Sequence, residues 1–115
     1  MLTIDTLKAY GANVQEGLGR CMNNEAFYLR LVKMAAGDAN FDKLDSALAA
    51  GDLTGAFEAA HALKGMLGNL ALTPVLTPVA EVTEVLRAQT DTDYGPYRER
   101  IRAQHQALLE LFTVV

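Results

Sequence analysis

Apolar residues recur at intervals of three and four along nearly the whole chain, and short polar breaks interrupt them. This spacing gives a helix one buried face, whereas a half-buried strand would need strict alternation, which no segment shows convincingly. We therefore expect an all-α fold. Four amphipathic helices of ten or more residues, joined by short loops, indicate an antiparallel four-helix bundle with short N-terminal helices covering one end.

Two short helices are expected within about residues 3–22. Thr3 is placed to cap the first, which Gly11 ends, and the second covers about residues 13–22. The bundle follows over about residues 24–112. Together they are expected to form a single domain, because 115 residues suffice for one modest core. The four methionines and the aromatic residues are assigned to that core.

The central helix of the bundle is expected to be the longest. Gly51 closes the helix before it, and Asp52 is placed to cap it. It then runs from about Leu53 to Leu72, with a stripe of leucines and alanines on its buried side.

The helix after the central one has two possible starts. Thr73 offers a capping hydroxyl and Pro74 suits the first helical position. Pro78, however, lacks an amide donor and crowds the carbonyl four residues before it. The helix therefore begins at Pro74 with a kink at Pro78, or begins at Pro78. The last helix covers about residues 96–112.

Two glycines interrupt the central helix beside its one histidine. Gly65 and Gly68 lie four and seven residues after His61, so all three share one face. Each glycine costs about 1 kcal/mol relative to alanine inside a helix. A helical wheel puts this face on the exposed side, which disfavours close packing of another helix as the reason for the glycines. We interpret the face as a place where a large partner approaches the imidazole.

Three further side chains are expected near His61. Lys64 lies one turn along, where its methylenes can cover Phe57 and its ammonium can approach the imidazole. Leu72 falls close to the same angle on the wheel, so it would be an exposed docking residue if the helix extends that far. An ordinary solvent-facing histidine with a lysine neighbour is the alternative, and it leaves both glycines unexplained.

This combination of side chains suits the acceptance of a phosphoryl group. A neutral imidazole is a nucleophile, and an ammonium can offset the nearly two negative charges that a phosphoryl group brings. The sequence has no glycine-rich phosphate loop and no Walker-type motif, so we expect neither ATP binding nor kinase activity. The phosphoryl group would come from one protein and pass to another.

Composition argues against several other classes of protein. A formal net charge of −4 disfavours nucleic-acid binding, and no apolar run approaches the roughly 18 residues of a membrane span. The N-terminus lacks the pattern of a signal peptide. The single cysteine, Cys21, fits a reducing cytoplasm, and it matches no metal-ligand spacing with the two histidines. We expect a cytoplasmic monomer without a metal site.

The run AHALKGMLGNL over residues 60–70 resembles the signature of histidine-containing phosphotransfer (HPt) domains of two-component phosphorelays. The segment LDSALAAGD over residues 44–52 is similar to the stretch that precedes that signature in the family. The resemblance extends over about residues 27–86. Two positions depart from the family pattern, since Met66 replaces a small residue and Ala71 a glycine; neither is expected to impair function.

The resemblance implies a role for each residue of the site. His61 would be the phosphoacceptor, Lys64 would stabilise the phosphoryl group, and Gly65 and Gly68 would provide access. The partners would be the receiver domain of a response regulator and a sensor or hybrid histidine kinase. The receiver would supply the aspartate and the Mg²⁺, so we expect no cofactor in this chain.

Two alternatives belong to other functional classes. A module that binds a receiver domain without transferring phosphate would retain the same surface. A phosphatase would need a second acid, base or metal, and the sequence offers no such group. His105 follows an apolar stripe and is expected at the boundary of the core, and Cys21 is expected to be buried.

Overall fold

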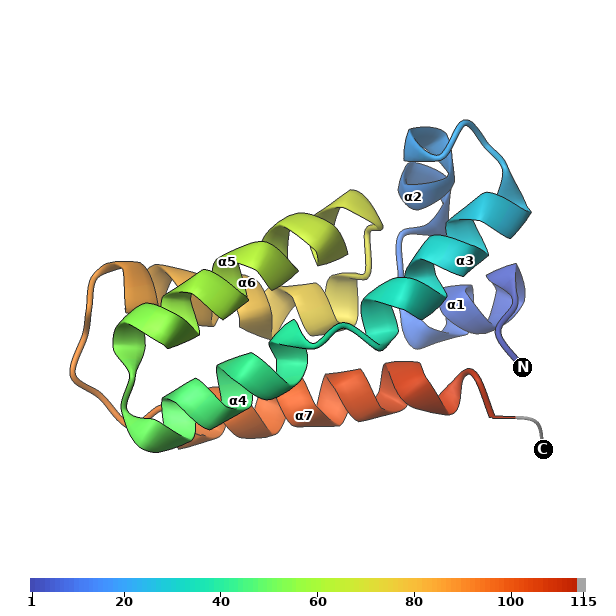
Figure 1. The fold of residues 1–115 in the computed structure, drawn as a ribbon. Helices are drawn as coiled ribbons and strands as arrows, with labels where there is room; N and C mark the ends of the chain where they lie inside the picture. The colour runs from blue at the N-terminus through green and yellow to red at the C-terminus, as the bar shows by residue number, and fades with distance from the viewer. Residues whose placement is uncertain (114–115) are drawn as a thin grey trace.

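The computed structural model describes residues 1–113, which contain seven α-helices and no strand (Figure 1). The helices are α1 (Ile4–Tyr10), α2 (Val14–Arg20), α3 (Glu25–Ala36), α4 (Asn40–Ala50), α5 (Leu53–Asn69), α6 (Thr73–Arg87) and α7 (Gly95–Glu110). This confirms the predicted all-α class. Among the described residues, no helix combines the length and the hydropathy that crossing a membrane requires.

Helices α4 to α7 form an antiparallel bundle, because the chain reverses direction at each connection between them (Figure 1). Contacts between α4 and α7 close the bundle: Arg98 donates to Asp45 at 2.9 Å, and the rings of Phe41 and His105 stack with centroids 3.6 Å apart. Helix α3 leads into α4 in roughly the same direction (Figure 1). Helices α1, α2 and α3 lie at the end of the bundle where α5 turns into α6 (Figure 1). The predicted bundle is confirmed.

The caps predicted at Thr3 and Asp52 are present, and Asn24 caps a further helix. Thr3 and Thr6 form a reciprocal capping box at α1, and Asn24 accepts a hydrogen bond from the amide of Phe27 at the start of α3. Asp52 accepts one from the amide of Gly55 at 3.0 Å, so it caps the central helix α5. These bonds satisfy amides that have no partner within the helix.

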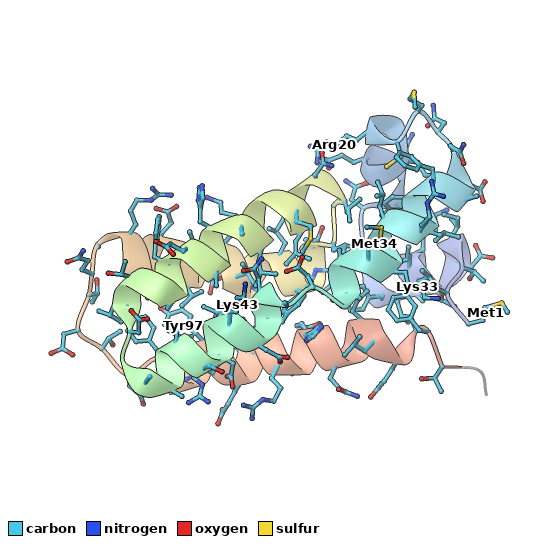
Figure 2. The ribbon with its side chains drawn as sticks, in the orientation of Figure 1. Met1, Arg20, Lys33, Met34, Lys43 and Tyr97 are labelled. Carbon is cyan, nitrogen blue, oxygen red and sulfur yellow. The ribbon has the colours of Figure 1, made fainter. Side chains whose placement is uncertain are left out.

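The hydrophobic core contains residues from α1 to α7 and is mainly aliphatic. Cys21 is buried, as predicted. The assignment of all four methionines to the core is wrong, because Met22 is exposed, as are Met1 and Met34 (Figure 2). Met1 precedes the first helix, Met22 lies in the turn after α2 with φ 56°, and Met34 lies on the exposed side of α3.

Helix α5 ends three residues earlier than predicted. Its last residue is Asn69, and Ala71 then adopts a left-handed conformation with φ 55°. The amide of Leu72 turns back to donate to the carbonyl of Leu67 at 3.0 Å. The prediction of Leu72 as an exposed docking residue is therefore wrong: its side chain is fully buried in the core.

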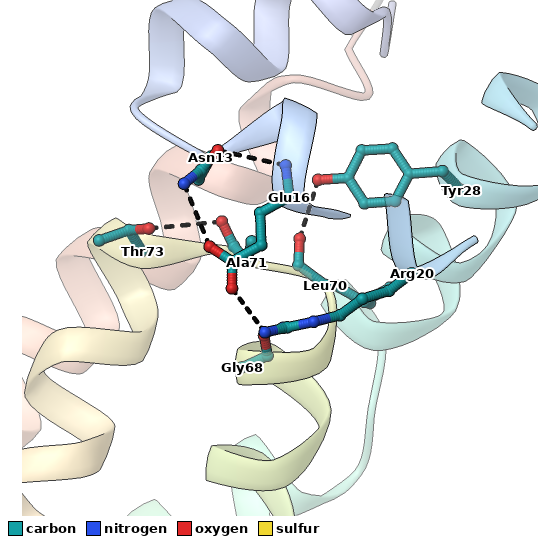
Figure 3. A network of polar contacts seen from close by, with 8 residues as sticks. All are labelled: Asn13, Glu16, Arg20, Tyr28, Gly68, Leu70, Ala71 and Thr73. Atoms are coloured by element: carbon teal, nitrogen blue, oxygen red, sulfur yellow. Dashed lines mark hydrogen bonds and ion pairs between the residues drawn. The ribbon is translucent and has the colours of Figure 1, made fainter. Parts of the chain in front are cut away.

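Hydrogen bonds from the N-terminal segments explain this early end (Figure 3). Arg20 donates to the carbonyl of Gly68, and the hydroxyl of Tyr28 donates to the carbonyl of Leu70 at 2.8 Å. Burial raises the pKa of Tyr28 to about 12, which keeps its donor proton in place. The amide of Asn13 donates to the carbonyl of Ala71 at 2.9 Å. A carbonyl in the last turn of α5 and two in the turn that follows are thus bonded to residues distant in sequence.

Helix α6 begins at Thr73 and continues through Pro78. Of the two predicted starts, the earlier is confirmed. The predicted cap is wrong, since the N-cap residue is Leu72 and no side chain caps this helix. The hydroxyl of Thr77 instead donates to the carbonyl of Thr73 at 2.9 Å. Burial of Pro78 against the core helps to offset the backbone hydrogen bond that proline cannot donate.

Substitution of Gly17 tests how tightly α2 packs on α3. A Cβ at Gly17 would lie 2.5 Å from Cε1 of Tyr28, whose ring is fully buried and held by the bond to Leu70. We expect Gly17→Ala to lower the free energy of unfolding by about 1–3 kcal/mol, measured by urea denaturation followed by circular dichroism.

Gly19 in the same helix is the matched control for that experiment. A Cβ there would meet nothing within 4 Å. Gly19→Ala should leave the free energy of unfolding unchanged or raise it by up to about 1 kcal/mol. Equal stability of the two variants would contradict the packing role of Gly17.

Candidate functional site

His61 lies on the exposed face of α5, as the helical wheel predicts. Its imidazole stacks on the ring of Phe57, four residues earlier, with centroids 5.6 Å apart and an interplanar angle of 17°. The half-buried phenyl ring supports one face of the imidazole. The site therefore presents a nucleophilic ring on a rigid helix, with its orientation restrained by a neighbour.

Gly65 leaves open surface on α5 one turn after His61, and Gly68 is half-buried. A Cβ built on Gly65 would meet nothing within 4 Å. One built on Gly68 would reach only the methyl groups of Leu76 at 4.0 Å, an ordinary van der Waals distance. Neither residue has to be glycine for α5 to pack. Close helix packing is therefore excluded as the reason for them, which agrees with the interpretation from sequence.

Lys64 is half-buried, and its ammonium is paired across to α6. Its Nζ lies 3.3 Å from Oε1 of Glu84. The sequence predicts that Lys64 lies one turn from His61, and the helix confirms this. The sequence does not indicate that Glu84 is the acidic partner of Lys64. The cation above Phe57 is Arg87, whose Cζ lies 5.1 Å from the ring centroid.

Glu84 and Arg87 are the residues at this site that sequence reasoning missed. The Nε of Arg87 donates to Oε2 of Glu84 at 3.1 Å, so one carboxylate holds both cations. The hydrogen bond from Arg87, and then that from Lys64, lower the pKa of Glu84 below its usual range. Only the spacing of three between Glu84 and Arg87 is visible in the sequence; their placement against α5 depends on the register of two antiparallel helices.

The structure brings together four of the predicted site residues on one helix: His61, Lys64, Phe57 and Gly65. Gly68 lies near the end of the same helix, half-buried, with its carbonyl bonded to Arg20. Leu72 does not belong to this surface. Within residues 1–113, no group of three or more His, Cys, Asp or Glu side chains has an arrangement that could hold a metal ion.

The second histidine lies elsewhere, between α4 and α7. His105 is half-buried against Phe41, and its Nε2 lies 2.7 Å from the carbonyl oxygen of Ala36. A cavity of about 100 Å³ adjoins this stack. His105 is thus a boundary residue, as predicted.

Comparison of the sequence with known protein families identifies the family to which this helical bundle belongs. The family model of the Hpt domain matches residues 34–111, which is more than half of the chain. The matched range contains helices α4 to α7 completely, and with them His61. The chain belongs to the Hpt domain family. No curated protein and no solved structure matches it. Hpt domains act in histidine phosphotransfer within two-component signalling, and they work with kinases and response regulators without being kinases. The resemblance found in the sequence is confirmed.

Substitution of Gly65 tests whether the fold needs this glycine. Because the position is exposed and open, Gly65→Ala should raise the free energy of unfolding by up to about 1 kcal/mol, the difference in helix propensity between the two residues. Urea denaturation measures this change. A loss of stability would show that the backbone or a neighbour requires glycine there.

Proposed function

We propose that the protein is a phosphorelay intermediate that accepts a phosphoryl group on His61 and exchanges it with the aspartate of a response-regulator receiver domain. The observation that supports this most directly is the exposed imidazole of His61 within a matched Hpt domain, beside open surface at Gly65. The donor upstream would be a sensor or hybrid histidine kinase.

In the proposed transfer, a nitrogen of His61 attacks the phosphorus of the receiver's aspartyl phosphate. The N–P bond forms as the P–O bond to the carboxylate breaks, and the carboxylate leaves with the electron pair. The second ring nitrogen keeps its proton, and the stack on Phe57 holds the ring in orientation. Lys64 offsets the charge of the phosphoryl group. Mg²⁺ would belong to the receiver, so the chain itself needs no cofactor.

The proposed docking surface consists of Phe57, Gly65 and Gly68 around His61. The absence of side chains at the two glycines would let the receiver's active site reach the imidazole, and Phe57 would provide apolar contact. The chain would act as a cytoplasmic monomer, a transfer protein without an ATP site. A module that binds the receiver without transfer remains an alternative that the experiment below distinguishes.

Labelling tests the acceptor directly. Mixed with a receiver domain phosphorylated by acetyl phosphate, the wild type should acquire a phosphate that is labile in acid and stable in base. His61→Gln should abolish this labelling, because it removes the nucleophile. His105→Gln is the matched control and should label as well as the wild type, since His105 lies between α4 and α7.

The outcomes of this labelling separate the candidate functions. Labelling that survives in His61→Gln would show that another residue is the acceptor. A wild type that binds the receiver with full affinity but acquires no phosphate would support the non-transferring module.

A larger side chain at Gly65 tests docking. Gly65→Gln should fold normally, because its side chain enters open space. It should lower the second-order rate constant of transfer about tenfold or more, equivalent to about 1.4 kcal/mol, because the side chain would stand between the receiver and His61. Rapid-quench measurement of the phosphorylated fraction gives this rate. An unchanged rate would remove Gly65 from the docking surface.

A further inference from the structure

We propose that Glu84 is a positioning residue that holds Lys64 and Arg87 and competes for them with the phosphoryl group on His61, so that it limits how far phosphotransfer proceeds toward phosphohistidine. This inference rests on the proposed function and deepens it. It concerns the balance of the transfer reaction, which neither the family match nor the docking surface determines.

Side-chain contacts lead from His61 through α5 and α6 to Lys64, and the backbone of α5 completes this circuit between Lys64 and His61. His61 stacks on Phe57, the guanidinium of Arg87 lies over Phe57, and Arg87 pairs with Glu84. Glu84 pairs in turn with Lys64, which lies one helical turn from His61. Lys64 thus lies one turn from His61 on the same helix, and Arg87 contacts the ring on which the imidazole stacks.

Glu84 is the only carboxylate in this circuit, and it divides its two oxygens between the cations. Oε1 accepts from Lys64 at 3.3 Å and Oε2 from Arg87 at 3.1 Å. The pKa of Glu84 lies below its usual range for this reason, so the carboxylate is ionised at neutral pH. Before phosphorylation, one negative charge thus neutralises part of the positive charge beside His61.

Phosphorylation would change this balance. The side chains of Lys64 and Glu84 are 39% and 58% exposed, so their pairing is weak and exchanges readily with other partners. A phosphoryl group with nearly two negative charges is a stronger acceptor for ammonium and guanidinium groups than a single carboxylate. Each cation that turns to the phosphoryl group must leave Glu84. The carboxylate therefore disfavours the phosphorylated state relative to a site with free cations.

The experiment measures an equilibrium ratio. The protein is phosphorylated with phosphoramidate, in a step that forms the N–P bond to His61, breaks the P–N bond of the reagent and releases ammonia. After removal of the reagent it is mixed with a receiver domain and Mg²⁺, and the phosphorylated fractions of both proteins are measured at equilibrium. This ratio depends on the free energies of the separate proteins and not on how well they dock.

Glu84→Gln should shift that ratio toward phosphohistidine by about three- to tenfold, because it frees both cations while keeping the shape of the side chain. Glu81→Gln is the matched control. Glu81 lies one turn earlier on α6 and pairs with Arg100 on α7. The substitution Glu81→Gln therefore removes one negative surface charge from the same helix without changing the circuit around His61. Its ratio should equal that of the wild type.

A second control separates competition from general repulsion. Glu58, exposed and one turn before His61 on α5, takes part in none of the ion pairs among the described residues. Glu58→Gln should shift the ratio less than Glu84→Gln. In a background that lacks both cations, Lys64→Met with Arg87→Met, the effect of Glu84→Gln should disappear.

Several results would overturn the inference while leaving the proposed function intact. The first is that Glu84→Gln gives the same ratio of phosphorylated fractions as Glu81→Gln, and the second is that it shifts the ratio toward the phosphorylated receiver. The third is that Glu58→Gln shifts the ratio as much as Glu84→Gln does. The fourth is that Glu84→Gln has its full effect in the variant that lacks both cations. By contrast, a wild type that phosphoramidate does not label at His61 would overturn the proposed function together with the inference.

Discussion

Hydrogen bonds to carbonyls in the last turn of α5 and in the turn after it fix where that helix ends, and much of the structure depends on that point. Because the helix stops at Asn69 and Ala71 turns the backbone, Leu72 enters the core and α6 begins immediately after it. The start of α6 sets its register against α5. That register brings Glu84 within reach of Lys64, so the charges around His61 follow from contacts made at the far end of the helix.

The sequence was sufficient at several positions where local chemistry decides structure, although not at Thr73, whose predicted cap is absent. The cap at Asp52 and the exposure of His61 depend on residues a few positions apart, and both were predicted. The end of α5 was not predictable in this way, because Arg20 and Gly68 are 48 residues apart. The partner of Lys64 was missed for the same reason, since helical periodicity says which face a residue occupies and nothing about which residue faces it.

The site combines a rigid part with an adaptable one. The imidazole of His61 is mounted on a continuous helix and stacked on Phe57, so its orientation is restrained before any partner arrives. The two cations, Lys64 and Arg87, have long and partly exposed side chains held by a shared carboxylate, and such groups rearrange at little cost in free energy. Neither the restrained imidazole nor the ion pairs require glycine at positions 65 and 68. A role in docking therefore explains these two glycines better than a role in packing does.

The Hpt model matches from residue 34 onward, yet Asn13, Arg20 and Tyr28 hold the end of the helix that bears His61. The set of residues joined by these hydrogen bonds is consequently wider than the matched region. A fragment trimmed to the matched residues would leave the carbonyls of Gly68, Leu70 and Ala71 without these donors. For transplanting this module into another signalling protein, the boundary that matters is set by hydrogen bonding and not by sequence similarity.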